Sequence, residues 1–279
     1  MKSSNNPNPE SSIIVLNYNT GEILKKCVES ILKTTKNLSV PRCELILIDN
    51  ASSDESIKSI KGTKSIKGIK TIQNSQNLGF SKGFNQGIRI ARGKYVLLLN
   101  PDTEVKPGAI QKLLEFAKNT PDAAVVAPKL LNPDGSTQAS AFKLPTLWNA
   151  VREYWLGEKG LFSKYIPQGG PTESLVMAAY LLTPRALKKV GLLNEKFFMY
   201  FEDLDYAKRV KEKGLKIYYL PQAEVIHYHG VSGKNLADEK NQWRRLIPSS
   251  KTYHGTLMHY LINLVIWSSQ KWEKAFHEK

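Results

Sequence analysis

Polar and turn-forming residues follow each of the first four apolar runs in the sequence, at the points where strands of a sheet would end. In chain order they are Asn17, Tyr18 and Asn19; Asp49 and Asn50; Asn77 and Gly79; and Asn100 and Asp102. Taken singly, each amide or carboxylate is typical of a turn. Ligands of open α/β sheets bind outside the carboxyl ends of the strands, so four such endings in succession predict a ligand site along that edge.

A second group of chemically capable residues is acidic. Glu202, Asp203 and Asp205 lie at the start of a predicted helix, in "MYFEDLDY". They could be helix caps alone, because the backbone N–H groups of a first turn favour carboxylates. The preceding segment "EKFFMYF" is aromatic, however, and would desolvate these acids at a cost in free energy. An ionised carboxylate beside an apolar wall is suited to act as a general base, so the cluster is a candidate catalytic site.

His227 ends the apolar segment "AEVIHY". A single histidine in such a place is more often a hydrogen-bonding residue of the core than a metal ligand. If Asp102 lies opposite it, a carboxylate, an imidazole and a diphosphate could together complete the shell of a divalent cation. The pair is therefore a candidate metal site whose existence depends on the fold.

Two common nucleotide-binding signatures do not occur in the sequence. No GxGxxG follows the first apolar run, and no GxxxxGK[ST] is found, so neither a dinucleotide fingerprint nor a P-loop is predicted. "NLGFSKGFNQG" does place Gly79, Gly83 and Gly87 four residues apart. On a helix they would share one face and allow a backbone or a ligand to approach closely.

The elements that must position these residues alternate between strand and helix patterns. Predicted strands cover 12–17, 44–50, 69–74, 94–100 and 123–128, and predicted helices follow Gly21 and cover 81–91 and 107–118. Further along, 173–182 resembles one buried strand, 203–213 a helix, and 216–221 and 223–228 two final strands. This alternation predicts an α/β fold with a mostly parallel sheet flanked by helices on both faces.

The composition limits the partners. Forty Lys and Arg against 25 Asp and Glu give a net charge of +15, which favours nucleic acid, a lipid surface or a phosphorylated substrate. Aromatic residues do not interleave with the basic ones as a base-stacking platform requires, so no nucleic acid is expected. Two cysteines without framework spacing, and a polar, disordered segment 1–11 without a secretory signal, predict a cytoplasmic protein.

The C-terminal segment 234–279 is basic and contains an amphipathic helix. Its apolar run, 256–267, is too short to span a bilayer and contains His259 and Asn263. Two alternatives remain for this helix. It packs on the domain or in a homodimer, or it lies on an anionic membrane surface, where its basic and tryptophan flanks would suit the interface.

Six motifs together resemble the inverting family-2 glycosyltransferases of GT-A fold, in particular the branch of rhamnosyltransferases. They are "SIIVLNYN", "LILIDNASSD", "QNLGFSKGFNQG", "LLLNPDT", "FFMYFEDLDYAKRVKEKG" and "VIHYHG", in the order and spacing of the family. The resemblance covers about Ser12 to Gly233 and implies one GT-A domain, 12–233, with a Rossmann-like nucleotide-binding sheet.

The resemblance implies a role for each matching residue. Asn17, Tyr18, Asn19 and Asp49 would hold the base and ribose of a nucleotide-sugar, and Asn77, Gly79, Asn85, Asn100 and Asp102 would help to position it. Asp102 and His227 would bind Mg²⁺ or Mn²⁺. Asp203 would be the catalytic base, with Glu202 beside it. Asn100 replaces the first aspartate of the family's metal-binding DxD motif, which leaves the metal with fewer charged ligands.

The implied reaction is a single displacement that inverts the anomeric configuration. The expected donor is dTDP-rhamnose, with UDP-sugars next, and the expected acceptor is a saccharide, polyprenyl-diphosphate-linked, in cell-surface polysaccharide synthesis at the inner face of the membrane. The alternative is a catalytically inactive relative that binds nucleotide-sugars or carbohydrates.

Overall fold

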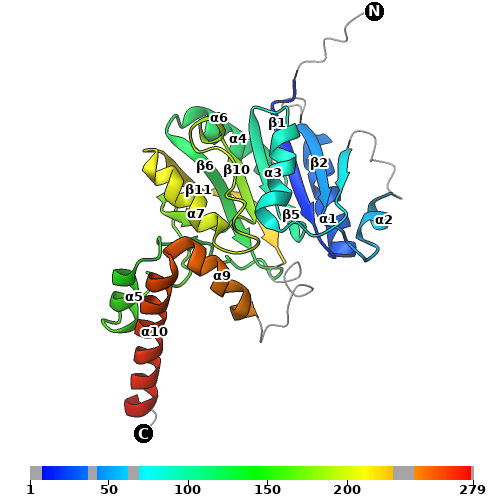
Figure 1. Ribbon diagram of the computed structural model, residues 1–279. Helices are drawn as coiled ribbons and strands as arrows, with labels where there is room; N and C mark the ends of the chain where they lie inside the picture. The colour runs from blue at the N-terminus through cyan, green and yellow to red at the C-terminus, as the bar shows by residue number, and fades with distance from the viewer. Residues whose placement is uncertain (1–7, 37–42, 62–68, 229–241, 278–279) are drawn as a thin grey trace, which may run out of the picture.

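A computed structural model describes residues 8–36, 43–61, 69–228 and 242–277 of the protein, and its centre is one nine-stranded sheet (Figure 1). The strand order is β3-β2-β1-β4-β10-β6-β11-β5, and β8 pairs with β11 beside this path. Strand bounds are β1 Ser11–Asn17, β2 Cys43–Asp49, β3 Ile69–Gln73, β4 Tyr95–Leu99, β5 Thr103–Val105, β6 Ala123–Leu131, β8 Gly170–Thr172, β10 Ala179–Leu182 and β11 Lys216–His227. The α/β fold with a mostly parallel mixed sheet is confirmed.

The direction of the strands brings the predicted ligand residues to one edge. β1 is parallel to β2 and β4, and β2 is parallel to β3. β10 is antiparallel to both β4 and β6, while β11 is parallel to β6. The carboxyl ends of β1 to β4 and of β11 therefore all lie at the same edge of the sheet, although β11 is far from the others in the sequence.

Helices cover both faces of this sheet. Apolar side chains of α1 (Glu22–Lys36) and α4 (Ala109–Asn119) belong to the core on one face. Those of α3 (Phe80–Ile90), α6 (Pro184–Lys189) and α7 (Glu202–Glu212) belong to the core on the other. The short α2 spans Ser56–Lys61. Nearly every strand of the centre is buried on both sides, which explains the continuous apolar runs in the sequence.

The glycines of α3 allow this helix to lie unusually close to the sheet. A Cβ atom on Gly83 would lie 2.5 Å from the Leu16 side chain, and one on Gly87 would lie 2.6 Å from Ile14. Both partners are on β1. The four-residue spacing places these glycines on one face of the helix, and this face packs closely on β1, as we predicted from the sequence.

Several elements differ from the sequence-based expectation. The run 173–182 is not one strand, because β9 (Ser174–Leu175) stops and the chain turns before β10 begins. The two predicted final strands are one strand, β11, whose register shifts between Leu220 and Glu224, around Pro221. Because proline lacks an N–H, an irregularity there interrupts the ladder without ending the strand. The short β7 (Ala141–Phe142) pairs with β9 in a separate ribbon.

The predicted N-terminal boundary is one residue late, and part of the predicted disordered segment is ordered. β1 begins at Ser11, and the Glu10 carbonyl accepts a hydrogen bond from Tyr95 N. Residues 1–7 lie outside the described part of the chain. The predicted domain boundary near Gly233 also lies outside it.

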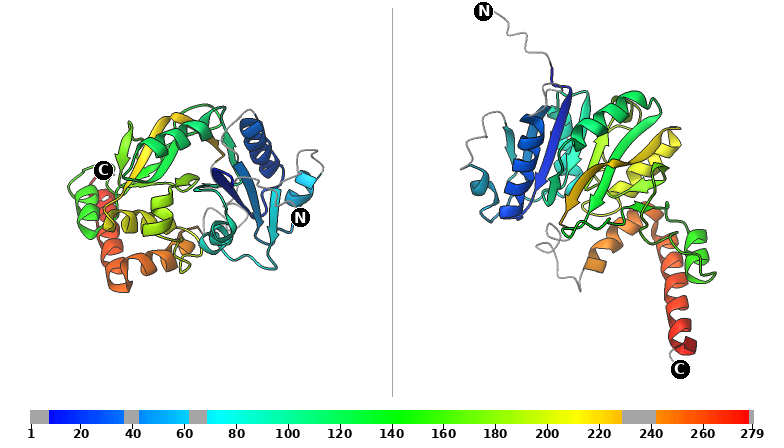
Figure 2. Two further views of the ribbon diagram at one scale, coloured as in Figure 1. Left: turned by 90° about the horizontal axis from the view of Figure 1, so that it is seen from above. Right: turned by 180° about the vertical axis from the view of Figure 1, so that it is seen from behind.

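The C-terminal segment forms two helices, α9 (Gln242–His254) and α10 (Thr256–His277). α9 packs on the domain, where Ser249 Oγ donates to the Met199 carbonyl. α10 extends away from the sheet beside α5 (Leu147–Tyr154), as both views show (Figures 1 and 2). Within the described ranges, no helix combines the length and apolar character needed to cross a membrane.

Candidate active site

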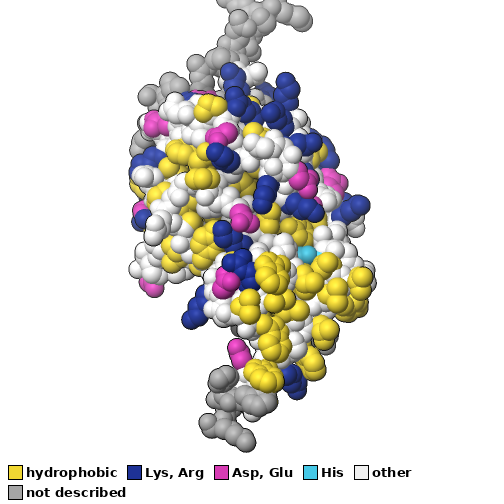
Figure 3. Space-filling model, turned by 90° about the vertical axis from the view of Figure 1, so that its left-hand side faces the viewer, with side chains coloured by type: hydrophobic (Ala, Val, Ile, Leu, Met, Phe, Trp, Pro, Cys, Tyr) yellow, Lys and Arg dark blue, Asp and Glu magenta, His cyan; other side chains and the backbone are white. Residues whose placement is uncertain are grey.

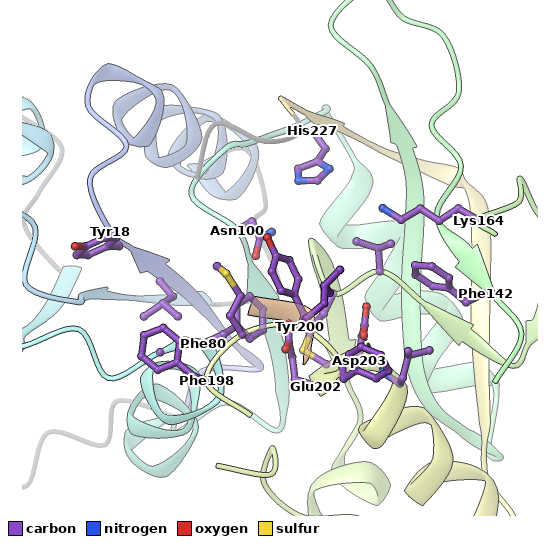
Figure 4. A pocket seen from close by; sticks show the side chains of 18 of the residues that line it. Tyr18, Phe80, Asn100, Phe142, Lys164, Phe198, Tyr200, Glu202, Asp203 and His227 are labelled. Carbon is purple, nitrogen blue, oxygen red and sulfur yellow. Dashed lines mark hydrogen bonds between the residues drawn. The ribbon is translucent and has the colours of Figure 1, made fainter. Parts of the chain in front are cut away.

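A cavity of about 580 Å³ lies at the edge of the sheet where the parallel strands end (Figure 4). Its lining includes residues from six chain segments that the sequence singled out: Tyr18, Asn50, Asn77, Gly79, Asn100, Glu202, Asp203 and His227. The cavity has room for a nucleotide-sugar, since ligand pockets are commonly 300–1,000 Å³. The predicted acidic cluster and the predicted strand-end residues therefore face the same space.

Asn17, Asn19 and Asp49 do not line the cavity but hold the turn that presents Tyr18. Asn17 Nδ2 donates to Asp49 Oδ1 at 3.0 Å and to Ser52 Oγ at 2.9 Å. Asn19, with a left-handed φ of 51°, accepts a hydrogen bond from Ser53 N. Asparagine tolerates that conformation better than most residues. These three side chains shape the β1 and β2 ends, and their predicted contact with a nucleotide stays a prediction.

Asn77 and Gly79 are held at the cavity by Asn50. The buried Asn50 side chain donates to Asn77 Oδ1 at 3.0 Å and to the Gly79 carbonyl at 3.1 Å. Gly79 has a φ of 82°, and a Cβ atom there would lie 2.6 Å from the Phe198 carbonyl. This position needs glycine because the Phe198 backbone, which bonds to Phe80 N, passes directly over it.

Asn85 is not brought to the cavity. Its side-chain amide donates to the Leu193 carbonyl and to Glu195 Oε1, and its oxygen accepts from Leu193 N. It therefore fastens α3 to the segment that precedes α7. The predicted role in positioning the donor finds no support in this placement, because Asn85 is fully buried and its polar atoms are used within the protein.

Asp102 and His227 do meet, as the metal hypothesis required. Asp102 Oδ1 lies 3.6 Å from His227 Nε2, and both side chains are buried. The pairing follows from the antiparallel contact of β5 with β11, which sets Thr103 opposite His227. Among the described residues, no group of three or more His, Cys, Asp or Glu is arranged to hold a metal ion. His227 lines the cavity, whereas Asp102 is fully buried behind the lining, so a cation held by the pair with substrate phosphates and water as its other ligands stays a prediction.

A chain of hydrogen bonds lies behind His227. Its Nδ1 is 2.7 Å from Gln138 Oε1, and Gln138 Nε2 donates to Asn132 Oδ1 at 2.9 Å. Asn132 Nδ2 donates to Ser136 Oγ, which in turn donates to Asp134. None of these residues was expected from the sequence to support the site.

Glu202 and Asp203 begin α7 at the cavity wall. Burial raises the pKa of both carboxyl groups, and the neighbouring Asp203 charge raises that of Glu202 further. Glu202 Oε2 is buried without a hydrogen-bond partner in the part of the chain that the structure describes. A pair of carboxyl groups with raised pKa values holds a proton near neutral pH, which is the usual property of catalytic acids and bases.

The backbone before α7 is strained. Tyr200 and Phe201 both have left-handed φ angles, 68° and 69°, which non-glycine residues rarely adopt. The Phe201 ring packs on Tyr253 and His254 of α9, at centroid distances of 5.5 and 5.9 Å. This packing holds the turn that directs Glu202 and Asp203 into the cavity.

The cavity also has walls whose residues belong to none of the six motifs. Phe142, Phe162, Lys143 and Lys164 come from the irregular region between β6 and β8, and Leu246 comes from α9. Their spacing in the sequence does not connect them with the motifs. They meet the motif residues only in the folded protein.

A family model described as glycosyl transferase family 2 matches residues 12–180, which is more than half of the 279 residues. The chain belongs to this family. The family-2 chain is similar to an N-acetylglucosaminyl-diphospho-decaprenol L-rhamnosyltransferase of Mycobacterium tuberculosis, with 27% identity over 79% of this chain and 76% of that protein. It is also similar to the low-salt glycan biosynthesis hexosyltransferase Agl10 of Haloferax volcanii, with 26% identity over 79% and 67%. The predicted family and the glycosyltransferase class of enzyme are confirmed.

Solved structures agree in fold. GalNAc-T7, solved with UDP, GalNAc and Mn²⁺, aligns over 80% of this chain and 44% of its own at 18% identity, with a TM-score of 0.61. The mannosyltransferase PcManGT of Pyrobaculum calidifontis, solved with GDP-Man and Mn²⁺, aligns over 93% and 65% at 14% identity, with a TM-score of 0.58. This family-2 glycosyltransferase therefore has the GT-A fold.

Proposed function

We propose that this glycosyltransferase moves a sugar from a nucleotide-sugar to a hydroxyl group of a saccharide acceptor, with inversion at the anomeric carbon. The observation that carries the proposal is the placement of Asp203 and Glu202, with raised pKa values, in the cavity that Tyr18, Asn77 and Asn100 also line. The acceptor oxygen attacks the anomeric carbon, the bond from that carbon to the diphosphate breaks, and Asp203 takes the hydroxyl proton.

The two acids share the available protons as a pair. Burial raises the pKa of both carboxyl groups, and the charge on one disfavours ionisation of the other, so the pair retains one proton after the first has left. We assign the ionised carboxylate, the base, to Asp203 and the retained proton to Glu202. A protonated Glu202 can donate a hydrogen bond to a sugar hydroxyl, which would orient the donor or the acceptor at the base.

Asp102 and His227 are the residues that would hold a divalent cation, Mg²⁺ or Mn²⁺, with Asn100 nearby in the cavity wall. Such a cation, when bound, stabilises the negative charge of a departing diphosphate. His227 keeps its ring in place through Gln138. Tyr18 and Asn77 would then contact the nucleoside at the opposite end of the cavity.

The rhamnosyltransferase relative guides the choice of substrates. We infer that dTDP-rhamnose is the first donor to test, followed by UDP-sugars, and that the acceptor is a sugar carried on a polyprenyl diphosphate. An acceptor of this kind places the reaction at the cytoplasmic face of the cell membrane, where a cell-surface glycan would be assembled.

The exposed aromatic and aliphatic side chains of α5 and α10 support membrane attachment. Trp148, Trp155, Leu257, Leu264 and Trp267 are each more than 45% exposed. Figure 3 shows hydrophobic side chains gathered over the lower part of the molecule, where these helices lie. Lys251 and Lys271 lie against the Tyr260 and Trp267 rings, and such pairs of cations and aromatic rings suit an anionic lipid surface.

The experiment that tests the function compares Asp203→Asn with Asp205→Asn. Asp205 lies on the same helix but pairs with Arg209 at 2.8 Å and does not line the cavity. Asp203→Asn should lower transfer by about 10²- to 10⁴-fold while leaving donor affinity nearly unchanged, because only the base is lost. Asp205→Asn should keep most of the activity.

Radiolabelled sugar transfer and thermal shifts with a panel of nucleotide-sugars, with and without Mg²⁺ or Mn²⁺, would measure both quantities. Transfer by Asp203→Asn at the wild-type rate would disprove its role as base. A wild-type protein that binds a donor yet neither transfers nor hydrolyses the sugar would instead be the inactive relative.

A further inference from the structure

Lys164 is a cavity residue without an assigned task in sugar transfer. Its side chain points into the cavity from the wall opposite Tyr18 (Figure 4). The next residue, Tyr165, exchanges backbone hydrogen bonds with Ala141, which fixes this segment to β7. The ammonium group lies 5.6 Å from the centre of the Phe142 ring. The backbone at Lys164 is therefore fixed at the wall, and its exposed side chain lies over the Phe142 ring.

The charge of Lys164 is not neutralised by a close acidic partner. In the described parts of the chain it makes no ion pair, whereas Lys143, the other lysine of the cavity wall, pairs with Glu173 at 3.3 Å. The acidic group that acts on Lys164 is Asp203, and Lys164 in turn lowers the pKa of that carboxyl group. A lysine that lines a cavity and makes no ion pair among the described residues can bind an anionic ligand.

Lys164 and the strand-end residues lie on different sides of the cavity. In Figure 4, Tyr18 and Asn100 lie to one side of Asp203, and Lys164 and Phe142 lie to the other. The base faces the acceptor hydroxyl, so the Lys164 side is the acceptor side. From Phe142 the chain continues within a few residues into α5, which lies beside α10. Trp148 on α5 and Trp155 directly after it are exposed.

We propose that Lys164 binds a phosphate group of the acceptor, so that the enzyme selects a sugar carried on a phosphate or diphosphate over a neutral glycan. This inference rests on the proposed function, because it assumes that Asp203 marks the acceptor hydroxyl. In a sugar diphosphate the phosphate is joined to the same ring that carries the attacking hydroxyl. A cation near the base is therefore suitably placed to bind it.

The test uses two acceptors that differ in charge, namely a sugar diphosphate with a short alkyl chain and the neutral alkyl glycoside of the same sugar. At a pH well above the pKa of Asp203, Lys164→Met should raise KM for the diphosphate acceptor by about 10- to 100-fold with little change in kcat, because one charge-assisted hydrogen bond is lost. KM for the neutral acceptor should not change. Lys164→Arg should retain most of the preference, and Lys159→Met, on the same segment but outside the cavity lining, serves as the matched control.

Binding measurements separate the two phosphate sources. Titration calorimetry with a nucleoside diphosphate and Mn²⁺ should give the same affinity for the wild type and Lys164→Met, and a loss there would assign Lys164 to the donor and overturn the proposal. An equal loss on the charged and the neutral acceptor would also overturn it. Wild-type transfer that shows no preference for the diphosphate acceptor would refute the inference and leave the proposed function intact.

Discussion

The hydrogen bonds behind His227 have a fixed direction. Asp134 can only accept, so Ser136 donates to it and accepts from the amide of Asn132. Asn132 then accepts from Gln138, whose remaining oxygen faces His227 Nδ1 at 2.7 Å. Nδ1 therefore carries a proton, which leaves Nε2, on the side of Asp102, as the nitrogen that would bind a metal. An imidazole fixed in this tautomer is the form that binds a metal.

Gln138→Leu should weaken Mn²⁺ binding in the presence of a nucleoside diphosphate by about 10- to 100-fold, as is usual for the loss of such a supporting partner. Gln138→Glu keeps an oxygen acceptor for the Nδ1 proton and should weaken Mn²⁺ binding less than Gln138→Leu does. Electron paramagnetic resonance of free Mn²⁺ would measure the affinity directly. Unchanged affinity in Gln138→Leu would mean that His227 needs no support from Gln138.

The pH dependence of transfer follows from the pKa of Asp203. Burial raises that pKa, so the base becomes protonated, and kcat falls, at a pH above the value of about 4 expected for an ordinary aspartate. Lys164 acts in the opposite sense and lowers the pKa of Asp203. The acid limb of the kcat profile should therefore move to higher pH in Lys164→Met and stay in place in Lys164→Arg. A limb that does not move would show that the lysine charge is not felt by the base.

At the scale of elements, Glu44 joins three neighbouring strands and a helix end. Its carboxylate accepts hydrogen bonds from Ser12 on β1, Lys70 on β3 and the Arg92 backbone after α3. Burial acts to raise the pKa of Glu44, but these bonds outweigh it and lower the pKa to about 2. The stabilisation is thus present above the unfolded-state pKa of about 4.3 and is lost as the pH falls from there toward 2.

Glu44→Gln should lower the free energy of unfolding by about 1 to 3 kcal/mol at neutral pH, because charged hydrogen bonds become neutral ones. Glu55→Gln, which removes an exposed pair with Lys58, should cost less than about 1 kcal/mol. Urea unfolding at pH 7 and at pH 3 would measure both. The difference between wild type and Glu44→Gln should shrink at the lower pH, and a constant difference would contradict the ionic origin of the effect.

Strand periodicity was sufficient to predict β1 to β4 and the edge at which they end, because each is a continuous apolar run closed by a turn residue. It could not find the turn before β10, since Val176 and Met177 are apolar yet line the cavity. It also could not separate Asn77, which reaches the cavity, from Asn85, which bonds to Leu193. Both are asparagines near the same helix, and only tertiary contacts distinguish them.

Individual site residues outside the motifs could not be predicted from the sequence. Lys164 lies in an irregular segment, and its relation to Asp203 depends on the pairing of Tyr165 with Ala141. Gln138 likewise meets His227 only because β6 and β11 run side by side. Long-range pairings of this kind leave no spacing signal in a single sequence.

For the whole molecule, the surface of α5 and α10 predicts binding to anionic vesicles. Trp267→Ser or Leu264→Ser should each weaken binding to phosphatidylglycerol vesicles by about tenfold or more, because burial of one large apolar side chain contributes about 1.5 to 3 kcal/mol. Binding should also fall with added salt, as expected for the basic residues beside the rings. Ile90→Ser, on α3 and away from these helices, is the control.

Vesicle sedimentation would measure this binding, and light scattering would measure mass in the absence of lipid. Equal binding of wild type and both α10 variants would contradict attachment through this surface. A mass that corresponds to a dimer in the wild type and to a monomer in the variants would show that the surface pairs two copies of the chain.

α9 has a practical consequence for the search for substrates. Leu246 lines the cavity, and Tyr253 and His254 cover the ring of Phe201 just before the two acids. A shortened protein that ends before Gln242 would keep every motif residue and still lose part of the cavity wall. If this shortened protein showed no activity in a donor screen, the cause would be the missing helix and not an unsuitable sugar. Screens therefore require the whole chain, with a mild detergent to cover α10.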